Sequence, residues 1–336
     1  MKNKKILVTG GAGYIGSHVV RQLGEAGESV VTLDNLCTGY EAAVTSGDLV
    51  IGDTGDTELL DTIFDDHGID TVMHFAAHTI VPESVADPLK YYRNNTANSR
   101  TLLEACQKHG VKNFVFSSTA AVYGIPPEGK AAENTPTRPI NPYGTSKLMT
   151  EWMLRDLALA GGPNYVTLRY FNVAGCEPSG TIGQSTPKAT LLVKVACEHV
   201  VGKRQEISIF GTDYATPDGT ALRDYIHVED LAIAHLDALT YLRDGGKPTT
   251  LNCGYGHGYS VREVLDAVEQ ACGEPLNRVE SPRRAGDPPI LVAVTEKIQK
   301  VIGWTPQFDD LDTIVKTSLE WERKIAAEDP TAYWPT

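Results

Sequence analysis

Residues 5–16 read KILVTGGAGYIG, a short apolar run that leads directly into a glycine-rich turn. The run over residues 5–9 is typical of a buried strand. Beyond the turn, Val19, Leu23 and Ala26 repeat at the spacing of one helix face. A strand, a glycine-rich turn and a helix in this order predict the first unit of a dinucleotide-binding fold.

The three spaced glycines of the turn have separate roles in such a unit. Gly10 can take the tight turn, Gly13 lets the backbone approach a pyrophosphate, and Gly16 permits close packing of helix on strand. A glycine-rich turn without a ligand is the alternative. Asp34, 18 residues after Gly16, argues against that alternative, because its carboxylate can accept hydrogen bonds from ribose hydroxyls and repels a 2′-phosphate. Since residues 35–39 contain no Arg or Lys, we expect NAD rather than NADP.

Apolar, β-branched runs alternate with helical patterns through the first half of the chain. This alternation predicts an α/β protein with a Rossmann-type doubly wound parallel sheet and a smaller, mixed α/β C-terminal substrate domain. We expect residues 1–172 to form the NAD-binding domain, with a return segment at about 223–248, and residues 173–222 and 249–336 to form the substrate domain. The expected strands are 5–9, 29–33, 48–51, 70–75, 113–116 and 165–170, with 226–231 as a strand running into a helix through 243, and a helix near 309–326.

Composition excludes several other classes of protein. The 336 residues carry 30 Lys and Arg against 43 Asp and Glu, a net charge of −13 that makes a nucleic-acid partner improbable. The six cysteines are dispersed without a C-x-x-C pair, so we expect no metal site and no disulfide framework. No run of about 18 apolar residues is present, so no membrane span is expected. The apolar run at the start is too short for a signal peptide, which favours a cytoplasmic protein.

Tyr143 and Lys147 lie four residues apart, on one face of a predicted helix, and Thr119 ends the predicted strand before them. Lowering a tyrosine pKa by three units takes about 4 kcal/mol. A cation about 5 Å away at an effective dielectric of about 20 supplies roughly 3 kcal/mol. We therefore expect Lys147, with the positive ring of oxidised nicotinamide, to lower the pKa of Tyr143 and make it a base. A surface Tyr–Lys pair and a strand-end threonine that caps a turn are the alternatives.

Together these motifs resemble the extended short-chain dehydrogenase/reductase family, most closely its UDP-hexose 4-epimerase branch. The resemblance covers nearly the whole chain. It is carried by the segments 10–18, 33–36, 74–77, 83–85, 91–95, 143–147, 169–172 and 223–228.

The resemblance implies an isomerase with a tightly held NAD, a UDP-hexose substrate and catalytic residues Tyr143, Lys147 and Thr119. Tyr143 would take the proton of the sugar 4-hydroxyl as the C4 hydride leaves. The 4-keto sugar would then turn over and receive the hydride on its other face, interconverting UDP-galactose and UDP-glucose. The implied cofactor-binding residues are Gly10, Gly13, Tyr14, Ile15, Gly16, Asp34, Asn35, Asp53, Thr54, Phe75, Ala76, Ala77, Asn94, Ser117, Tyr143, Lys147 and Tyr170. The implied substrate-binding residues are Ser118, Thr119, Asn172, Thr190, Leu191, Phe210, Arg223, Tyr225, Arg284 and Asp287.

Some of these assignments have a plainer alternative. Asp53 could contact adenine or cap its own turn, and Arg223 could pair with the neighbouring Asp224 instead of a diphosphate. The implied family dimer would use helices near 88–109 and 143–160, whose apolar residues could equally be core.

Departures from the family pattern bear on the substrate. Ala120 and Ala121 stand where related dehydratases carry an acid and a base, so 6-hydroxyl elimination is not expected. Thr79 replaces a lysine that some epimerases place on the cofactor ribose. The family's size gate falls at Leu291, which is smaller than the tyrosine that excludes N-acetyl sugars, so we expect at most modest activity on UDP-N-acetylglucosamine. The alternatives are a 4-epimerase of UDP-N-acetylglucosamine or UDP-glucuronate, and a non-catalytic NAD-binding regulator.

Overall fold

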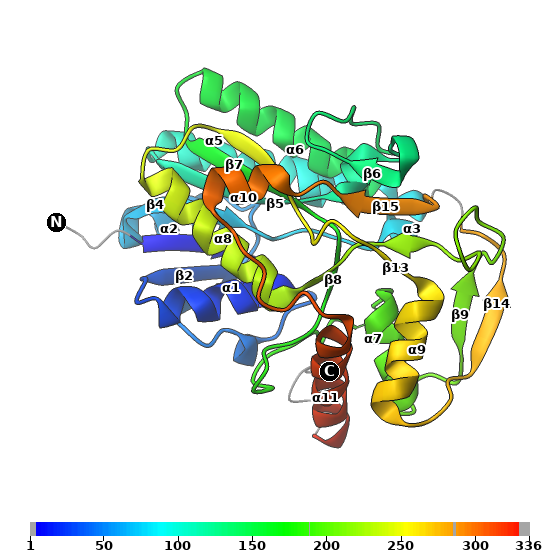
Figure 1. Ribbon diagram of the computed structural model, residues 1–336. Coiled ribbons are helices and arrows are strands. Elements are labelled where there is room, and N and C mark those ends of the chain that lie inside the picture. The colour runs from blue at the N-terminus through cyan, green and yellow to red at the C-terminus, as the bar shows by residue number, and fades with distance from the viewer. Residues whose placement is uncertain (1–4, 188, 285–286, 329–336) are drawn as a thin grey trace.

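A computed structural model describes residues 5–187, 189–284 and 287–328. Its centre is a seven-stranded sheet of order β12-β7-β5-β4-β1-β2-β3, with every neighbouring pair parallel (Figure 1). The strands are β1 (Lys5–Thr9), β2 (Val30–Asp34), β3 (Asp48–Ile51), β4 (Ile69–His74), β5 (Asn113–Thr119), β7 (Asn164–Tyr170) and β12 (Thr249–Cys253). The Rossmann-type doubly wound sheet expected from the sequence is confirmed.

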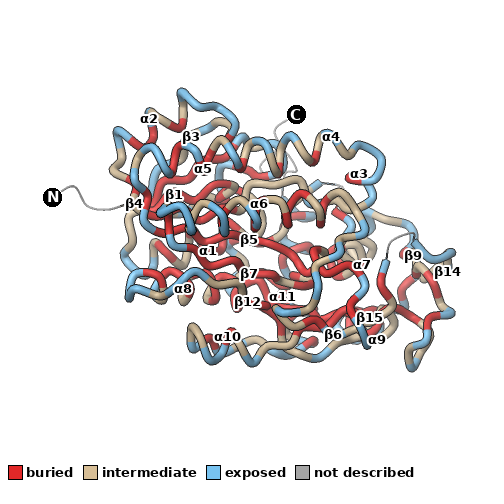
Figure 2. Tube along the Cα trace, turned by 90° about the horizontal axis from the view of Figure 1, so that it is seen from above, coloured by how far each residue is buried: buried red, intermediate tan, exposed pale blue. Residues whose placement is uncertain are grey.

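Helices cover both faces of this sheet. Successive residues of a strand point to opposite faces, so Ile6 and Val8 join one apolar cluster and Leu7 joins another. The first cluster packs under α1 (Tyr14–Glu25), α8 (Val228–Arg243) and α10 (Glu296–Ile302). The second packs under α2 (Thr57–His67), α5 (Asn98–Lys108) and α6 (Pro142–Leu159). The tube in Figure 2 shows the strands as the buried centre of this layer.

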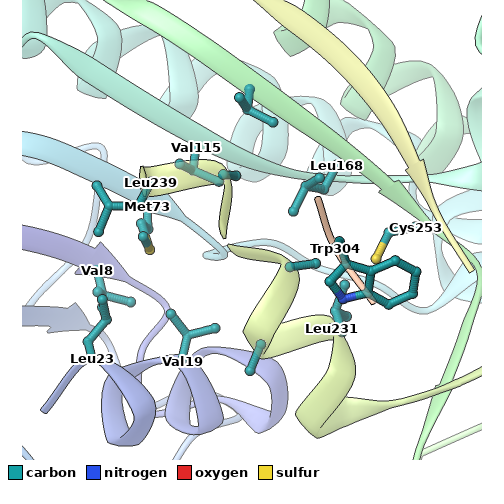
Figure 3. Close-up of a cluster of buried hydrophobic side chains, with 14 of the residues drawn as sticks. Val8, Val19, Leu23, Met73, Val115, Leu168, Leu231, Leu239, Cys253 and Trp304 are labelled. Atoms are coloured by element: carbon teal, nitrogen blue, oxygen red, sulfur yellow. The ribbon is translucent and has the colours of Figure 1, made fainter. Parts of the chain in front are cut away.

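Figure 3 shows how the first cluster is filled. Val19 and Leu23 of α1 and Leu231 and Leu239 of α8 face Val8 and its neighbours on the sheet. Val19 and Leu23 are fully buried as their spacing predicts, whereas Ala26 is the exposed C-cap of α1. The helix face is therefore one turn shorter than the sequence pattern suggests.

The smaller, mixed α/β part lies beside the carboxyl ends of the sheet (Figure 1). Its core packs α7 (Leu192–Val200), α9 (Val261–Cys272) and α11 (Leu311–Ala327) together, and α11 confirms the helix expected near 309–326. Its strands are β6 (Lys130–Ala131), β8 (Asn172–Ala174), β9 (Ile207–Phe210), β10 (Leu222–Arg223), β11 (Tyr225–His227), β13 (Tyr259–Ser260), β14 (Arg278–Ser281) and β15 (Ile290–Ala293). The remaining helical segments are η1 (Glu41–Ala43), α3 (Val81–Ala86), α4 (Pro88–Tyr91), η2 (Tyr92–Ala97), η3 (Ala120–Tyr123) and η4 (Pro127–Gly129).

Two expected elements have different bounds, and one segment belongs to a different part of the protein. The run 226–231 is a strand only in β11, because α8 begins at Val228, where the His227 side chain accepts the Glu229 N–H and caps the helix. Residues 249–253 form β12 at the edge of the main sheet, although the sequence pattern places them in the substrate part. The single helix expected at 88–109 is α4 and α5 joined by the π-helical η2.

Candidate active site

The carboxyl ends of β1, β2, β4 and β5 open onto one cavity of about 910 Å³. Ligands of open parallel sheets bind at this edge, where the strand order reverses. Most of the residues expected at the site lie in its wall. They are Gly10, Gly13, Tyr14, Ile15, Gly16, Asp34, Asn35, Asp53, Thr54, Phe75, Ala76, Ala77, Asn94, Thr119, Tyr143, Tyr170, Asn172, Thr190, Leu191, Arg223, Arg284 and Asp287.

The glycine turn has the shape of a phosphate cradle. Gly10 has φ +72°, and a Cβ there would lie 2.5 Å from the Ala76 backbone nitrogen. A Cβ on Gly16 would overlap the Gly10 carbonyl. Gly13 is the N-cap of α1 and has no side-chain cap, so the first N–H groups of the helix face the cavity. Since free N–H groups and the positive end of a helix favour a phosphate, the turn fits a dinucleotide.

Asp34 lies at the end of β2 in the cavity wall. Its two oxygens accept the backbone N–H groups of Ala12 (2.9 Å) and Leu36 (2.8 Å), which fix the carboxylate beside the glycine turn. Burial raises its pKa. Because a carboxylate has about four acceptor positions, Asp34 keeps capacity for ribose hydroxyls.

Asp53 caps its own turn, and its expected contact with adenine stays a prediction. It accepts the Gly55 N–H at 2.8 Å, which is a turn cap, and it lines the cavity. The side-chain amides of Asn98 (2.7 Å) and Asn35 (2.9 Å) also donate to it. These donors hold the carboxylate in place in the cavity wall.

Helix α6 carries the Tyr–Lys pair. It begins at Pro142, a residue suited to the first helical position, and Asn141 caps it by accepting the Gly144 N–H at 2.8 Å. Tyr143 and Lys147 are both buried, on successive turns of the same face. The surface alternative for this pair is therefore wrong.

Lys147 is directed at strand β5. Its Nζ donates to the Ser117 carbonyl at 2.9 Å and lies 4.9 Å from the centroid of the Phe116 ring. Burial lowers the pKa of Lys147 to about 7, and Glu151 opposes that shift.

Tyr143 shares a hydrogen bond with Thr119, and this bond favours a lower pKa. Burial outweighs it and raises the pKa of Tyr143 well above the ordinary value. The expected lowering of this pKa requires Lys147 and the positive ring of oxidised nicotinamide together, and it stays a prediction.

Two arginines lie in the wall of the cavity. Arg223 donates to Asp287 at 3.2 Å and not to Asp224, whose oxygens instead accept backbone N–H groups of other segments. The Arg284 guanidinium lies 3.7 Å from the Phe210 ring centroid. Two planar guanidinium donors in the wall of one cavity suit a diphosphate. Residues 285–286, which join Arg284 to Asp287 in the expected motif, lie outside the described residues.

Leu291 lies in the cavity wall, as the alignment of the size gate requires. It is on β15, paired in register with Arg223 on β10. The Leu222 N–H donates to the Pro289 carbonyl at 2.9 Å, which fixes this register beyond the double proline. Thr79 also lines the cavity and contributes no charge.

Five expected residues do not line the cavity: Ser117, Ser118, Lys147, Phe210 and Tyr225. Ser117 and Lys147 lie directly behind its wall, and Phe210 meets it through Arg284.

The expected substrate contact of Ser118 is wrong. Alternation along β5 turns it to the opposite face from Thr119, and its hydroxyl donates to the buried Glu151 carboxylate at 2.6 Å. Tyr225 is likewise in the apolar core of the smaller part, so the structure gives it no direct place in the cavity.

Several lining residues were not expected from the sequence, among them the run 80–83. The available signal was the segment 83–85, which carries the family resemblance without an assigned role. Across the described ranges, no group of three or more His, Cys, Asp or Glu side chains is arranged to hold a metal ion. The same ranges contain no helix with the length and apolarity of a membrane span.

Comparisons with known proteins agree with this geometry. Residues 6–254 match the model of the NAD dependent epimerase/dehydratase family. A UDP-glucose 4-epimerase of Azospirillum brasilense is 56% identical over 96% of this chain and 92% of its own length. The crystal structure of a UDP-glucose 4-epimerase from Brucella ovis in complex with NAD superposes with a TM-score of 0.92 at 41% identity, covering 95% of this chain and 98% of that one.

The UDP-Glc/GlcNAc 4-epimerase of Campylobacter jejuni is also similar, with a TM-score of 0.84 at 45% identity over 96% of this chain and 99% of that one. The family match covers the Rossmann sheet with its glycine turn and the Tyr–Lys helix, and the full-length relatives extend it over the smaller part. The chain therefore belongs to the NAD-dependent epimerase/dehydratase family, within which its relatives are UDP-glucose 4-epimerases.

Proposed function

We propose that the chain interconverts UDP-galactose and UDP-glucose by reversible hydride transfer at C4. The observation that carries the proposal is the hydrogen-bonded pair of Tyr143 and Thr119, which lies in one cavity between the glycine turn and the two arginines. A dinucleotide held at the glycine turn and a nucleotide sugar held at the arginines would meet at this pair.

Bound NAD supplies the hydride acceptor and donor. The chain's own residues then handle the proton of the 4-hydroxyl. Thr119 accepts or donates a hydrogen bond at the reacting oxygen, and Tyr143 takes the proton as hydride leaves and returns it afterwards. Lys147 holds the Ser117 carbonyl and supports the helix face from which Tyr143 projects.

The nucleotide stays anchored while the hexose turns over. Arg223 and Arg284 bind the diphosphate, with Asn172 as a further polar contact and Leu191 contributing backbone. Asp287 exchanges its contact with Arg223 for the uridine ribose. Phe210, already stacked on Arg284, forms the nucleoside end of the site.

The sugar is an unmodified hexose. Ala120 and Ala121 lie in the cavity wall beside Thr119 and have no acid or base group, so elimination of the 6-hydroxyl is not supported. Leu291 narrows the wall near Arg223 and leaves at most modest activity on UDP-N-acetylglucosamine. Equal turnover of UDP-N-acetylglucosamine and UDP-glucose would show that this gate is open.

The remaining expectations concern organisation. Residues 1–172 with the return segment 223–248 bind NAD, together with residues 249–253, which form β12 of the main sheet, and residues 173–222 and 254–336 bind the UDP-sugar. The protein works in the cytoplasm as a homodimer through the helices at 88–109 and 143–160. Leu89 (73% exposed) and Trp152 (45% exposed) on those helices support such an interface, and light scattering of the purified protein tests it.

The test of function is to incubate the purified protein with UDP-galactose, without added NAD, and to measure UDP-glucose. Product is expected, because the cofactor need not leave the site. Tyr143→Phe should lower turnover by about a hundredfold or more while NAD stays bound. Tyr241→Phe, at a half-buried tyrosine whose hydroxyl donates to the Lys247 carbonyl at 3.0 Å, is the matched control and should leave turnover unchanged. A protein that binds no NAD and leaves UDP-galactose unchanged would refute the proposal.

A further inference from the structure

Tyr91 contacts the proposed base from behind the cavity wall. It is the last residue of α4, and its side chain is fully buried. Its ring centroid lies 6.5 Å from that of Tyr143, with the two planes at 84°, an edge-to-face contact. Such a contact fixes the plane of a neighbouring ring as well as its distance.

The Tyr91 hydroxyl is hydrogen-bonded to residues 80 and 83 in the cavity wall. It lies 2.6 Å from the Ile80 carbonyl oxygen and 2.8 Å from Glu83 Oε2, and it accepts the Ile80 N–H at 2.9 Å. Ile80 and Glu83 both line the cavity. One side chain therefore joins this wall to the ring of Tyr143.

The charges around Tyr91 keep it neutral. Lys90 donates to the other oxygen of Glu83 at 2.6 Å, and the hydrogen bonds from Lys90 and Tyr91 lower the pKa of Glu83. The carboxylate is thus ionised at neutral pH and remains an acceptor. Burial raises the pKa of Tyr91, so its hydroxyl keeps its proton.

We propose that Tyr91 is a positioning residue for this reaction, with its ring orienting Tyr143 and its hydroxyl holding the 80–83 wall against the sugar. The proposal rests on the proposed role of Tyr143 as base. It predicts that the two parts of the side chain act on different kinetic constants. Loss of the ring lowers kcat, because the base is misplaced, and loss of the hydroxyl alone raises KM, because the wall loosens.

The test compares Tyr91→Leu with Tyr91→Phe in the NAD-bound enzyme. Tyr91→Leu should lower kcat at least about tenfold, because displacement of a catalytic group by about 1 Å can cost a hundredfold. Tyr91→Phe should raise KM for UDP-galactose severalfold with kcat nearly unchanged. Should Tyr91→Leu not fold, Tyr91→Met serves in its place.

Tyr255→Phe is the matched control. Its hydroxyl also lies against a carboxylate, Asp230 at 2.6 Å, and accepts a backbone N–H, that of His227 at 3.1 Å, but the residue does not line the cavity. It should lower the melting temperature about as much as Tyr91→Phe and leave both kinetic constants unchanged. If both Tyr91 variants changed kcat and KM in the same proportion, or if the control did so too, Tyr91 would be merely structural.

A second readout does not depend on turnover. The Tyr143 ring is compared in crystal structures of the wild type, Tyr91→Leu and Tyr91→Phe. Tyr91→Leu should rotate or shift that ring, because the edge-to-face contact is lost, whereas Tyr91→Phe should leave it in place. An unmoved Tyr143 ring in Tyr91→Leu would overturn the proposal even if UDP-galactose were not a substrate. Failure of the proposed function therefore remains distinguishable.

Discussion

Burial of Lys147 should make the stability of the NAD-free protein depend on alkaline pH. The pKa of this lysine is about 7 in the folded protein against 10.5 in the unfolded chain. Between these two values the unfolded chain binds more protons than the native state, so the free energy of unfolding rises with pH. Below pH 7 Lys147 is protonated in both states, so the native state carries the full free-energy cost of burying its charge.

The size of the effect follows from the shift. Each pH unit within this window contributes about 1.4 kcal/mol, so the term grows by about 4 kcal/mol from pH 7 to pH 10. Lys147 is only 2% exposed, so solvent screening does not reduce the term substantially. Glu151 opposes the shift, and the value of about 7 already includes this opposition.

Urea unfolding of NAD-free protein at several pH values measures this term. Lys147→Met removes the titrating group with little change in volume. The difference in unfolding free energy between the wild type and this variant isolates Lys147 from all other titrations. Lys108→Met, at a lysine that is 61% exposed, is the control and should follow the wild type in parallel. A wild-type minus Lys147→Met difference that stays constant from pH 7 to pH 10 would refute the reasoning.

Three further variants test the geometry of the site. Gly10→Ala forces a Cβ against the Ala76 backbone at a residue with positive φ. The variant should no longer retain NAD, which chromatography of released NAD measures, and its melting temperature should fall in thermal unfolding. Ser118→Ala removes only the bond to Glu151, so turnover should stay within about twofold of wild type while stability falls by about 1 kcal/mol, and a large loss of turnover would return Ser118 to the substrate site. Asp34→Asn should weaken NAD binding in equilibrium dialysis and narrow the preference for NAD over NADP, because the charge that repels a 2′-phosphate is removed.

Local patterns in the chain were sufficient for the sheet and for the cofactor. The spacing of Gly10, Gly13 and Gly16 after a strand, with Asp34 ending the next strand, is read within one βαβ unit, where sequence distance and spatial distance are closely related. The six strands expected from the apolar runs are all present for the same reason. Their ends differ from the expected ones by at most three residues, and the largest difference is in β5, which continues to Thr119.

The pairing of segments that are distant in sequence could not be predicted in this way. An apolar run does not indicate which strand it pairs with, and β12 belongs to the main sheet although the chain that follows it belongs to the smaller part. The partner of Arg223 is Asp287, 64 residues away, and not the adjacent Asp224, because β10 turns the two neighbouring side chains apart.

The sequence alone determined the kind of chemistry, since the residue types and spacings of the glycine turn and the Tyr–Lys helix are local. Only the tertiary structure decided how these groups are tuned. It placed Lys147 on a strand carbonyl, turned Ser118 away from the cavity and put Tyr91 behind Tyr143. Burial, hydrogen-bond partners and ring contacts are properties of packed surfaces, and packing joins residues that no local pattern relates.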